Sequence, residues 1–167
     1  MKQLTKKMIS TVCMTSILFS AGCTGAKDIK KESLEQQEVK SEIGKEKVSQ
    51  EMEMKIKVTG AKIIEDKTVS EQEQVVQVQF EIKNEGKDDN GIGAGDFVIQ
   101  DDKGKTYPMY GKEDNFGDVI PVGKSLKGNG YYNIAKGTKE LKVVYKPTVK
   151  QEMDEKTIEW KIGNLKK

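Results

Sequence analysis

Acidic side chains in the second half of the chain are the residues whose spacing could do chemistry. Asp88 and Asp89 form one pair, and Asp114 and Asp118 follow further along the chain. Carboxylates that converge from separate loops are the ligands that a hard cation such as Ca²⁺ prefers. Asp is also an ordinary turn residue, and the sequence contains no Asp-x-Asp-x-Asp-Gly run. These four aspartates are therefore weak candidates for a cation site, and the sequence predicts neither a committed metal ligand nor a cofactor.

The missing residue types limit the possible chemistry further. The 167 residues include 29 Lys but neither Arg nor His. The absence of His excludes Ser–His and Cys–His catalytic pairs and imidazole metal ligands. The absence of Arg excludes bidentate guanidinium contacts to phosphate or guanine. Paired carboxylates acting on a glycosidic bond, or a Ser–Lys couple, stay conceivable, but Lys and Glu are so frequent that such pairs arise by chance. We therefore expect that the protein is not an enzyme and that it has no catalytic residue.

Runs of alternating apolar and polar residues predict the strands that position these side chains. The predicted strands are Met54–Val58, Val76–Lys83, Phe97–Ile99 with its hairpin partner Lys105–Tyr107, Ser125–Ile134, Leu141–Tyr145 and Ile158–Ile162. About seven short strands separated by turn residues are typical of an all-β, antiparallel sandwich, with a closed barrel as the alternative. The expected core consists of Ile56, Val58, Val76, Val78, Phe80, Ile82, Phe97, Ile99, Leu141, Val143, Tyr145, Trp160 and Ile162.

Alternating strand directions predict which loops share an end of the sandwich. Residues 84–95, 110–124 and 147–156 should lie together, with the start of the first strand at the same end. This arrangement would bring the acidic loops together and turn them toward the preceding segment of the chain. The glycine-rich stretch Gly91–Gly95 is expected to be a flexible connection.

Aromatic residues offer a second candidate surface. An exposed patch for a peptide or glycan could be formed by Tyr107, Tyr110, Phe116, Tyr131 and Tyr132. Tyr131 and Tyr132 are adjacent on a predicted strand, so they must point to opposite faces. One of them could therefore be exposed, although most aromatic residues of a sandwich belong to the core.

Residues 1–22 have the pattern of an export signal. Three Lys precede the uncharged, largely apolar run Met8–Phe19, and small residues follow it. Ser20-Ala21-Gly22-Cys23 resembles the lipobox of bacterial lipoproteins, although Ser20 stands where Leu is usual. The resemblance implies that the Cys23 thiol forms a diacylglyceryl thioether. After cleavage, Cys23 would be the N-terminal residue, acylated by a fatty acid such as palmitate. Simple secretion and an uncleaved anchor are the alternatives.

Residues 23–53 are predicted to be a charged tether, disordered or partly helical. The segment is rich in Lys, Glu, Gln and Ser, and its apolar residues do not keep to one face of a helix. From Cys23 onward the chain contains 26 Lys against 27 acidic residues. A nearly neutral chain without Arg is a poor candidate for binding nucleic acid. Residues 54–167 are assigned to the folded domain.

The predicted domain resembles a known family. Val75–Gly86, Asp96–Tyr107, Pro121–Lys124 and Leu141–Pro147 carry the resemblance, together with Gly130-Tyr131-Tyr132 and Ile158-Glu159-Trp160. These segments are similar to the domain of unknown function 4352, which is common on lipoproteins of Gram-positive bacteria. The resemblance implies an immunoglobulin-like fold similar to that of immunoprotective extracellular antigens. Its motifs consist of turn and core residues, so they specify no chemistry.

Together these patterns predict a cell-surface lipoprotein. Lipid at Cys23 would anchor it to the outer face of the cell membrane, where an immunoglobulin-like module would bind an unknown protein or cell-wall ligand. The alternative is an accessory cation- or glycan-binding domain of the cell envelope, and an envelope hydrolase is a third possibility.

Overall fold

The computed structural model describes residues 40–147 and 157–166. The described chain folds into strands and one short 3₁₀ helix, so the predicted all-β class is confirmed. The strands are β1 (Glu46–Ser49), β2 (Met54–Ile64), β3 (Glu73–Asn84), β4 (Asn90–Gly93), β5 (Phe97–Gln100), β6 (Thr106–Tyr107), β7 (Gly117–Ile120), β8 (Ser125–Ala135), β9 (Leu141–Tyr145) and β10 (Ile158–Gly163), and the 3₁₀ helix η1 spans Ala94–Asp96. Every strand predicted from alternation overlaps one of these, whereas β1, β4 and β7 are additional.

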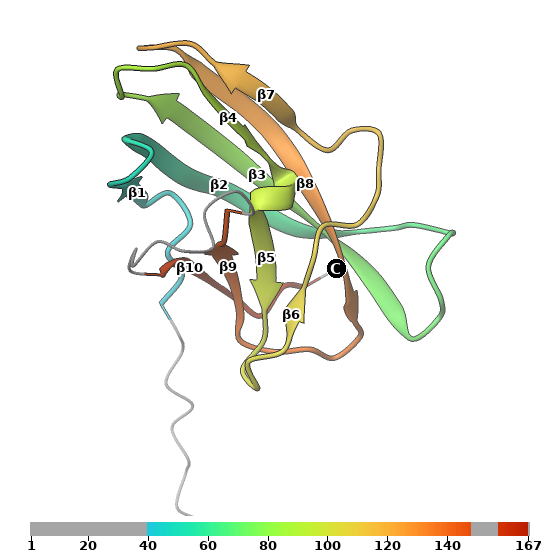
Figure 1. Cartoon of the computed structure of the whole chain (residues 1–167). Helices are drawn as coiled ribbons and strands as arrows, with labels where there is room; N and C mark the ends of the chain where they lie inside the picture. The colour runs from blue at the N-terminus through green and yellow to red at the C-terminus, as the bar shows by residue number, and fades with distance from the viewer. Residues whose placement is uncertain (1–39, 148–156, 167) are drawn as a thin grey trace, which may run out of the picture. The chain divides into compact units, whose positions relative to one another are not determined.

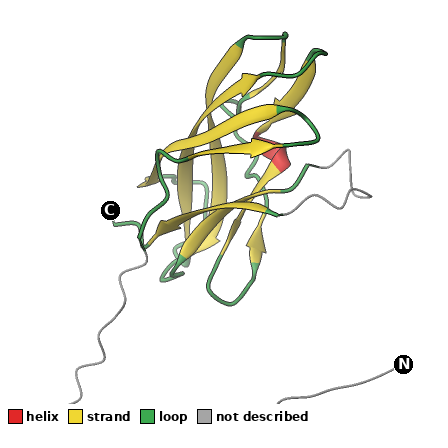
Figure 2. Ribbon diagram, turned by 90° about the vertical axis from the view of Figure 1, so that its left-hand side faces the viewer, coloured by secondary structure: helices red, strands yellow, loops and turns green. Residues whose placement is uncertain are grey.

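Two antiparallel sheets form the sandwich, as Figures 1 and 2 show. The first sheet has the strand order β1-β2-β3-β8, and the second has the order β10-β9-β5-β6. The short strands β4 and β7 pair with each other at the edge formed by β8. Backbone hydrogen bonds connect them to that edge, because Phe116 donates to Asn129 O (2.9 Å) and accepts from Ala94 N (2.9 Å).

The core lies between the two four-stranded sheets. All thirteen predicted core residues belong to it, and Trp160 is fully buried. Phe80 of the first sheet and Phe97 of the second have ring centroids 4.5 Å apart, so aromatic packing joins the sheets at their centre. Burying each such side chain contributes roughly 1.5–3 kcal/mol, which allows the domain to fold without a disulfide.

The folded domain begins before Met54, which corrects the predicted boundary. Residues 46–49 form β1 along the edge of β2, with Ser49 opposite Met54. The segment before β1 is bonded to the other sheet: Glu42 N donates to Lys161 O (2.7 Å), and Trp160 Nε1 donates to Lys45 O (2.9 Å). The prediction of a disordered or helical tether is therefore wrong for the end of that segment. Residues 1–39, which include the predicted signal, Cys23 and most of the tether, lie outside the described residues.

β1 also changes the point at which the chain joins the domain. Because β1 runs antiparallel to β2, Glu46 lies opposite Lys57, and Gly44 N donates to Val58 O (2.7 Å). The chain thus arrives part-way along β2 rather than at the end where Met54 pairs with Asn84. The expectation that the acidic loops face the preceding segment holds only for its last residues, since Glu85 N donates to Glu53 O (2.9 Å), whereas β1 leads the chain away from these loops.

The glycine-rich stretch is a strand and a 3₁₀ turn rather than a flexible connection. β4 pairs with β7 in register, with Ile92 opposite Asp118. Ile92 is buried, and Asp96 accepts a hydrogen bond from Gly93 N (2.8 Å). A Cβ at Gly93 would lie 3.2 Å from Phe116 O, so glycine here allows two backbones to approach closely.

No helix within the described ranges is long and apolar enough to cross a membrane.

The carboxylate of Glu42 is expected to make folding stability depend on pH. Burial by itself raises its pKa, but hydrogen bonds from Lys161 N, Lys45 and Lys47 outweigh burial and lower the pKa from 4.5 to about 2. The stabilisation is therefore complete above the unfolded-state value of 4.5 and is lost as the pH falls toward 2. We expect Glu42→Gln to cost about 1–2 kcal/mol at pH 7, an amount reduced for partial exposure, and almost nothing at pH 2.

Urea unfolding of both proteins at pH 7, 4 and 2 measures this difference. Glu46→Gln is the matched control, because the carboxylate of Glu46 is more exposed and its ion pair with Lys55 is longer (3.7 Å). A difference between wild type and Glu42→Gln that stays constant from pH 7 to pH 2 would contradict the assignment.

Candidate functional site

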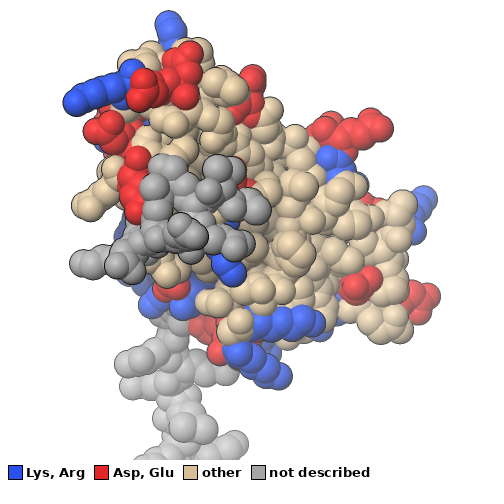
Figure 3. Space-filling model, in the orientation of Figure 1, with Lys and Arg blue, Asp and Glu red and all other residues tan. Residues whose placement is uncertain are grey.

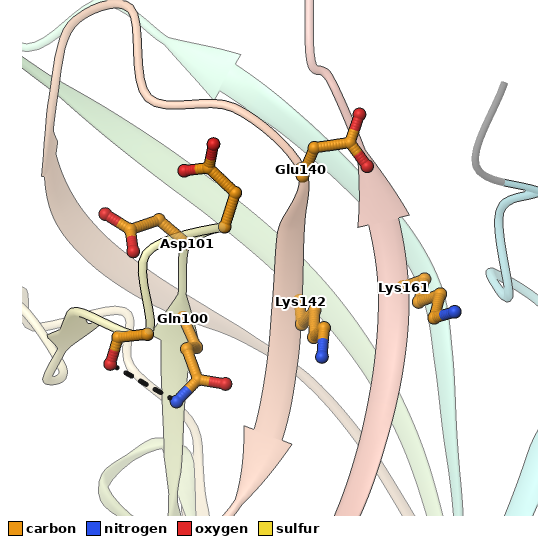
Figure 4. A pocket seen from close by; sticks show the side chains of 7 residues that line it. Gln100, Asp101, Glu140, Lys142 and Lys161 are labelled. Atoms are coloured by element: carbon orange, nitrogen blue, oxygen red, sulfur yellow. Dashed lines mark hydrogen bonds between the residues drawn. The ribbon is translucent and has the colours of Figure 1, made fainter. Parts of the chain in front are cut away.

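The candidate site is a hollow of about 380 Å³ on the outer face of the second sheet. Figure 4 shows it from close by. Its walls come from β5, the β5–β6 hairpin, the residue before β9, and the strands β9 and β10. The lining residues are Gln100, Asp101, Asp102, Gly104, Glu140, Lys142 and Lys161. A hollow of this size lies within the range that holds a small molecule.

Strand register places three side chains of the hollow in one row. Gln100 of β5 lies opposite Lys142 of β9, and Lys142 lies opposite Lys161 of β10. Residues in register on antiparallel neighbours share a face of the sheet. The row therefore carries one amide and two ammonium groups side by side across three strands.

Asp101 builds the rim of the hollow and is already fully engaged. Its Oδ1 accepts from Lys103 N (3.0 Å) and Lys105 N (2.8 Å), and its Oδ2 accepts from the Tyr107 hydroxyl (3.2 Å). Burial opposes ionisation of this carboxyl, but these hydrogen bonds prevail and lower its pKa. Asp101 therefore shapes the Asp101–Lys105 turn and leaves no oxygen without a donor.

Three other charged groups of the hollow have no ion pair with any described residue. These are the carboxylates of Asp102 and Glu140 and the ammonium of Lys161. Lys142 differs, because Glu159 accepts from its ammonium with both oxygens (3.0 and 3.1 Å). In Figure 4, Glu140 stands at the start of β9, and Lys142 and Lys161 lie further along the sheet. The hollow thus offers both signs of charge to a ligand.

Two of the three acidic loops meet as predicted, but the carboxylates that the structure describes there do not gather into a cation site. Asn84, at the end of β3, joins two of the loops: its Nδ2 donates to Asp88 O and Ile120 O (both 2.8 Å). Asp89 accepts from Val122 N (3.0 Å), and Asp118 accepts from the adjacent Val119 N (2.7 Å).

Asp114 lies elsewhere, in a turn that is closed by a hydrogen bond from Asn115 N to Lys112 O (3.2 Å). Within residues 40–147 and 157–166, no three acidic or thiol side chains are close enough to hold a metal ion. The third predicted loop, 147–156, lies almost wholly outside the described residues.

Acidic and basic side chains are mixed at this end of the domain. In Figure 3, several red groups with blue groups among them lie over the region of the β3–β4 and β7–β8 turns at the top left. Glu85 shows the reason, because both Lys83 (2.8 Å) and Lys55 (3.1 Å) pair with its carboxylate. These exposed ion pairs contribute little stability, but they place positive charge beside the acidic loops and so weaken the field that would attract a cation.

The predicted aromatic patch is mostly covered. Tyr107, Tyr131 and Tyr132 are buried, and Phe116 packs against the core. Tyr131 and Tyr132 do point to opposite faces, but the segment 109–116 lies along β8 and covers Tyr131. Tyr110 N donates to Tyr131 O (2.7 Å), and Tyr131 N donates to Asn115 Oδ1 (3.0 Å). An exposed aromatic platform is therefore not formed by these five residues.

A cluster of polar residues that was not predicted from the sequence holds the segment 109–116 against the sheet. Lys112 pairs with Asp66 of the β2–β3 loop, and its ammonium lies 5.7 Å from the centre of the Tyr131 ring. The hydrogen bond from Lys112 is the largest cause that lowers the pKa of Asp66 from 3.8 to about 2, and Thr68 adds to it. These residues are far apart in the sequence, and each contact secures a loop against the sheet, so we assign the cluster a structural role.

Comparison with known proteins gives matches over most of the chain. A family model described as "Domain of unknown function (DUF4352)" matches residues 41–156. The "Uncharacterized lipoprotein YcdA" of Bacillus subtilis is 29% identical over 156 residues, which is 90% of this chain but 42% of that protein. The chain thus spans less than half the length of this curated relative.

Solved structures agree on the fold. The crystal structure of YcdA from B. subtilis gives a TM-score of 0.57 at 25% identity, over 71% of this chain and 38% of that chain. The YjhA protein of B. subtilis gives 0.51 at 17% identity, over 71% of this chain and 96% of that chain. The secreted protein MPT63 of Mycobacterium tuberculosis gives 0.50 at 15% identity, over 71% and 93%. None of these descriptions names an enzymatic activity.

Proposed function

The chain belongs to the DUF4352 family, and on that premise we propose that it is a lipid-anchored binding module on the outer face of the cell membrane. The observation that carries the proposal is the hollow on the second sheet, where charges of both signs stand without partners among the described residues. Such groups suit recognition, because a ligand of complementary charge gains contacts that the protein itself does not make. The module is proposed to bind without catalysing a reaction.

The proposed anchor is Cys23. Ser20-Ala21-Gly22-Cys23 supports it, and the naming of the relative YcdA as a lipoprotein points the same way. Each buried methylene of an acyl chain contributes about 0.8 kcal/mol, and more than one chain is needed for stable attachment. A diacylglyceryl thioether on Cys23 supplies two chains. YcdA is much longer, so nothing specific to its other regions is transferred to this chain.

Replacement of Cys23 is expected to release the protein from the membrane. Cys23→Ala removes the only sulfur that the proposed modification uses, so the protein should move from the membrane fraction to the soluble fraction. The domain should stay folded, since the described structure starts at residue 40. Fractionation of expressing cells, with mass spectrometry of the N-terminal peptide, measures both effects.

Cys13→Ala is the matched control, because Cys13 is the other cysteine of the chain and the residue directly before it, Val12, is not small. The control should stay in the membrane fraction with its Cys23 peptide acylated. Retention of Cys23→Ala in the membrane would contradict the anchor.

Photo-crosslinking in intact cells tests the binding role. One protein carries a photoreactive residue at Gln100, in the hollow, and a matched protein carries it at Gln79, an exposed position on the outer face of the first sheet. We expect a reproducible adduct from position 100 and none from position 79. Equal labelling from both positions, or no labelling from position 100, would overturn the assignment of the hollow as the binding site.

A further inference from the structure

We propose that the hollow binds a short peptide of about two residues through its free ammonium and carboxylate ends. This inference rests on the proposed binding function and names the class of ligand. The acidic side chains stand at the hairpin end of the hollow, and the ammonium groups stand further along the sheet. A zwitterionic ligand can therefore lie along β9 with its amino end toward Glu140 and its carboxylate toward Lys161.

The backbone at Glu140 is the first support. Its φ of +52° lies in the left-handed region, which Gly or Asn adopts at lower cost than Glu. The neighbouring loops hold this conformation, since Glu140 N donates to Asn164 Oδ1 (2.9 Å) and Asp102 N donates to Lys139 O (3.4 Å). The turn alone would be better served by glycine, so the presence of a Glu with an unpaired carboxylate points to a use for that carboxylate.

The spacing of the charges is the second support. Glu140 directly precedes β9 and Lys142 is the second residue of that strand, so their backbones are at most about 7 Å apart. An extended chain also spans about 3.3–3.6 Å for each residue, so the two ends of a dipeptide match this separation. A long peptide cannot place both of its free ends within one hollow.

The carboxylate end of the ligand has a prepared set of donors. Lys161 has no ion pair with a described residue, and Lys142 keeps one of its three N–H groups beyond the two contacts to Glu159. The Gln100 amide is the third member of the row, although it also makes a long contact to Gly104 O (3.4 Å). Charge-assisted hydrogen bonds of this kind are stronger than neutral ones and favour an anion over a neutral amide.

Calorimetric titration of the detergent-solubilised full chain with alanyl-alanine tests the inference. The small side chains of this probe limit its recognition to the ends and the backbone. We expect a dissociation constant of about 0.1–1 mM, which is modest because the hollow is open to solvent. N-acetyl-alanyl-alanine and alanyl-alanine amide each lack one charge, and each should bind about tenfold more weakly.

Two substitutions on this chain complete the test. Glu140→Gly removes the carboxylate and relieves the left-handed strain, so it should weaken binding about tenfold while folding stability holds or rises. Lys161→Gln should weaken binding by a similar factor. The matched controls are Glu81→Gln and Lys127→Gln, which open an exposed ion pair on the other sheet and should leave binding unchanged.

Equal binding of the capped peptides, or no loss in Glu140→Gly and Lys161→Gln, would overturn the inference. Absence of alanyl-alanine binding would overturn it as well. If crosslinking from position 100 persists in that case, the binding role of the hollow stands and only the ligand class is wrong. If that crosslinking is also absent, both proposals fail.

Discussion

A variant that begins at Met54 is expected to be less stable than one that begins at Lys40 by about 4 kcal/mol or more. It loses β1 with four paired positions, and each backbone hydrogen bond of such a pair contributes about 1 kcal/mol. It also removes Lys45 O, the acceptor for the indole N–H of the fully buried Trp160 (2.9 Å). A loss of this size is a large fraction of the stability of an ordinary domain.

The fluorescence of Trp160, the only Trp of the chain, reports this effect during urea unfolding. The variant that begins at Lys40 should have the same midpoint as a variant that begins at Cys23, because the described contacts of the N-terminal segment start after Lys40. Equal midpoints for the variants that begin at Met54 and at Lys40 would show that β1 is dispensable.

Substitution of Asn84 is expected to have the second large effect, a loss of about 3 kcal/mol. Asn84 is completely buried and donates to Asp88 O and Ile120 O (both 2.8 Å), while its Oδ1 accepts from Gly86 N (2.9 Å). Asn84→Ala leaves two carbonyl oxygens and one N–H without this partner. Each buried polar group that loses its partner costs about 1–3 kcal/mol, and water entering the site recovers part of this.

Asn84→Asp removes the two N–H donors of the amide but keeps the size and shape of the side chain nearly unchanged. The carboxylate keeps the acceptor for Gly86 N but places a negative charge against two carbonyl oxygens, so this variant should lose as much stability at pH 7 as Asn84→Ala. Because the buried charge is disfavoured, the carboxyl pKa should rise, and stability relative to wild type should recover as the pH falls.

Thermal unfolding at pH 7 and pH 4 measures both Asn84 variants. Asn90→Ala is the control, because the Asn90 amide donates to the same Asp88 O at 3.2 Å in an exposed position. It should cost less than about 1 kcal/mol. A loss in Asn84→Ala no larger than this would contradict the role given to Asn84.

Sequence alternation was sufficient for the long strands and the core, and insufficient for the short edge strands. β3 and β9 carry runs of apolar residues whose faces can be assigned from the sequence alone. β1, β4 and β7 have no such run: their sequences are EKVS, NGIG and GDVI. Each short strand is held by backbone pairing to a neighbour and by few buried side chains. The β-propensity of their residues and the alternation of apolar and polar residues therefore do not predict these strands.

The hollow could not be found from the sequence, because its charges meet only through strand register. Gln100, Lys142 and Lys161 become neighbours when β5 and β10 pair with β9. Each is an ordinary polar residue on a strand, in a chain where Lys and Glu are common. The acidic loops show the opposite case, since strand parity brought Asp88, Asp89 and Asp118 to one end. Asp118 then accepts from the adjacent Val119 N, and Asp89 accepts from Val122 N of the other loop.

The bonds between the N-terminal segment and β10 have a mechanical consequence. A pull on Lys40 from the proposed membrane anchor reaches the contact between Glu42 and Lys161 and the contact between Lys45 and Trp160 before it reaches β1. These contacts pass the force to the second sheet, while β1 passes it to the first. With the proposed anchor and the proposed ligand in place, drag on the ligand is then expected to be opposed by both sheets together rather than by one edge strand.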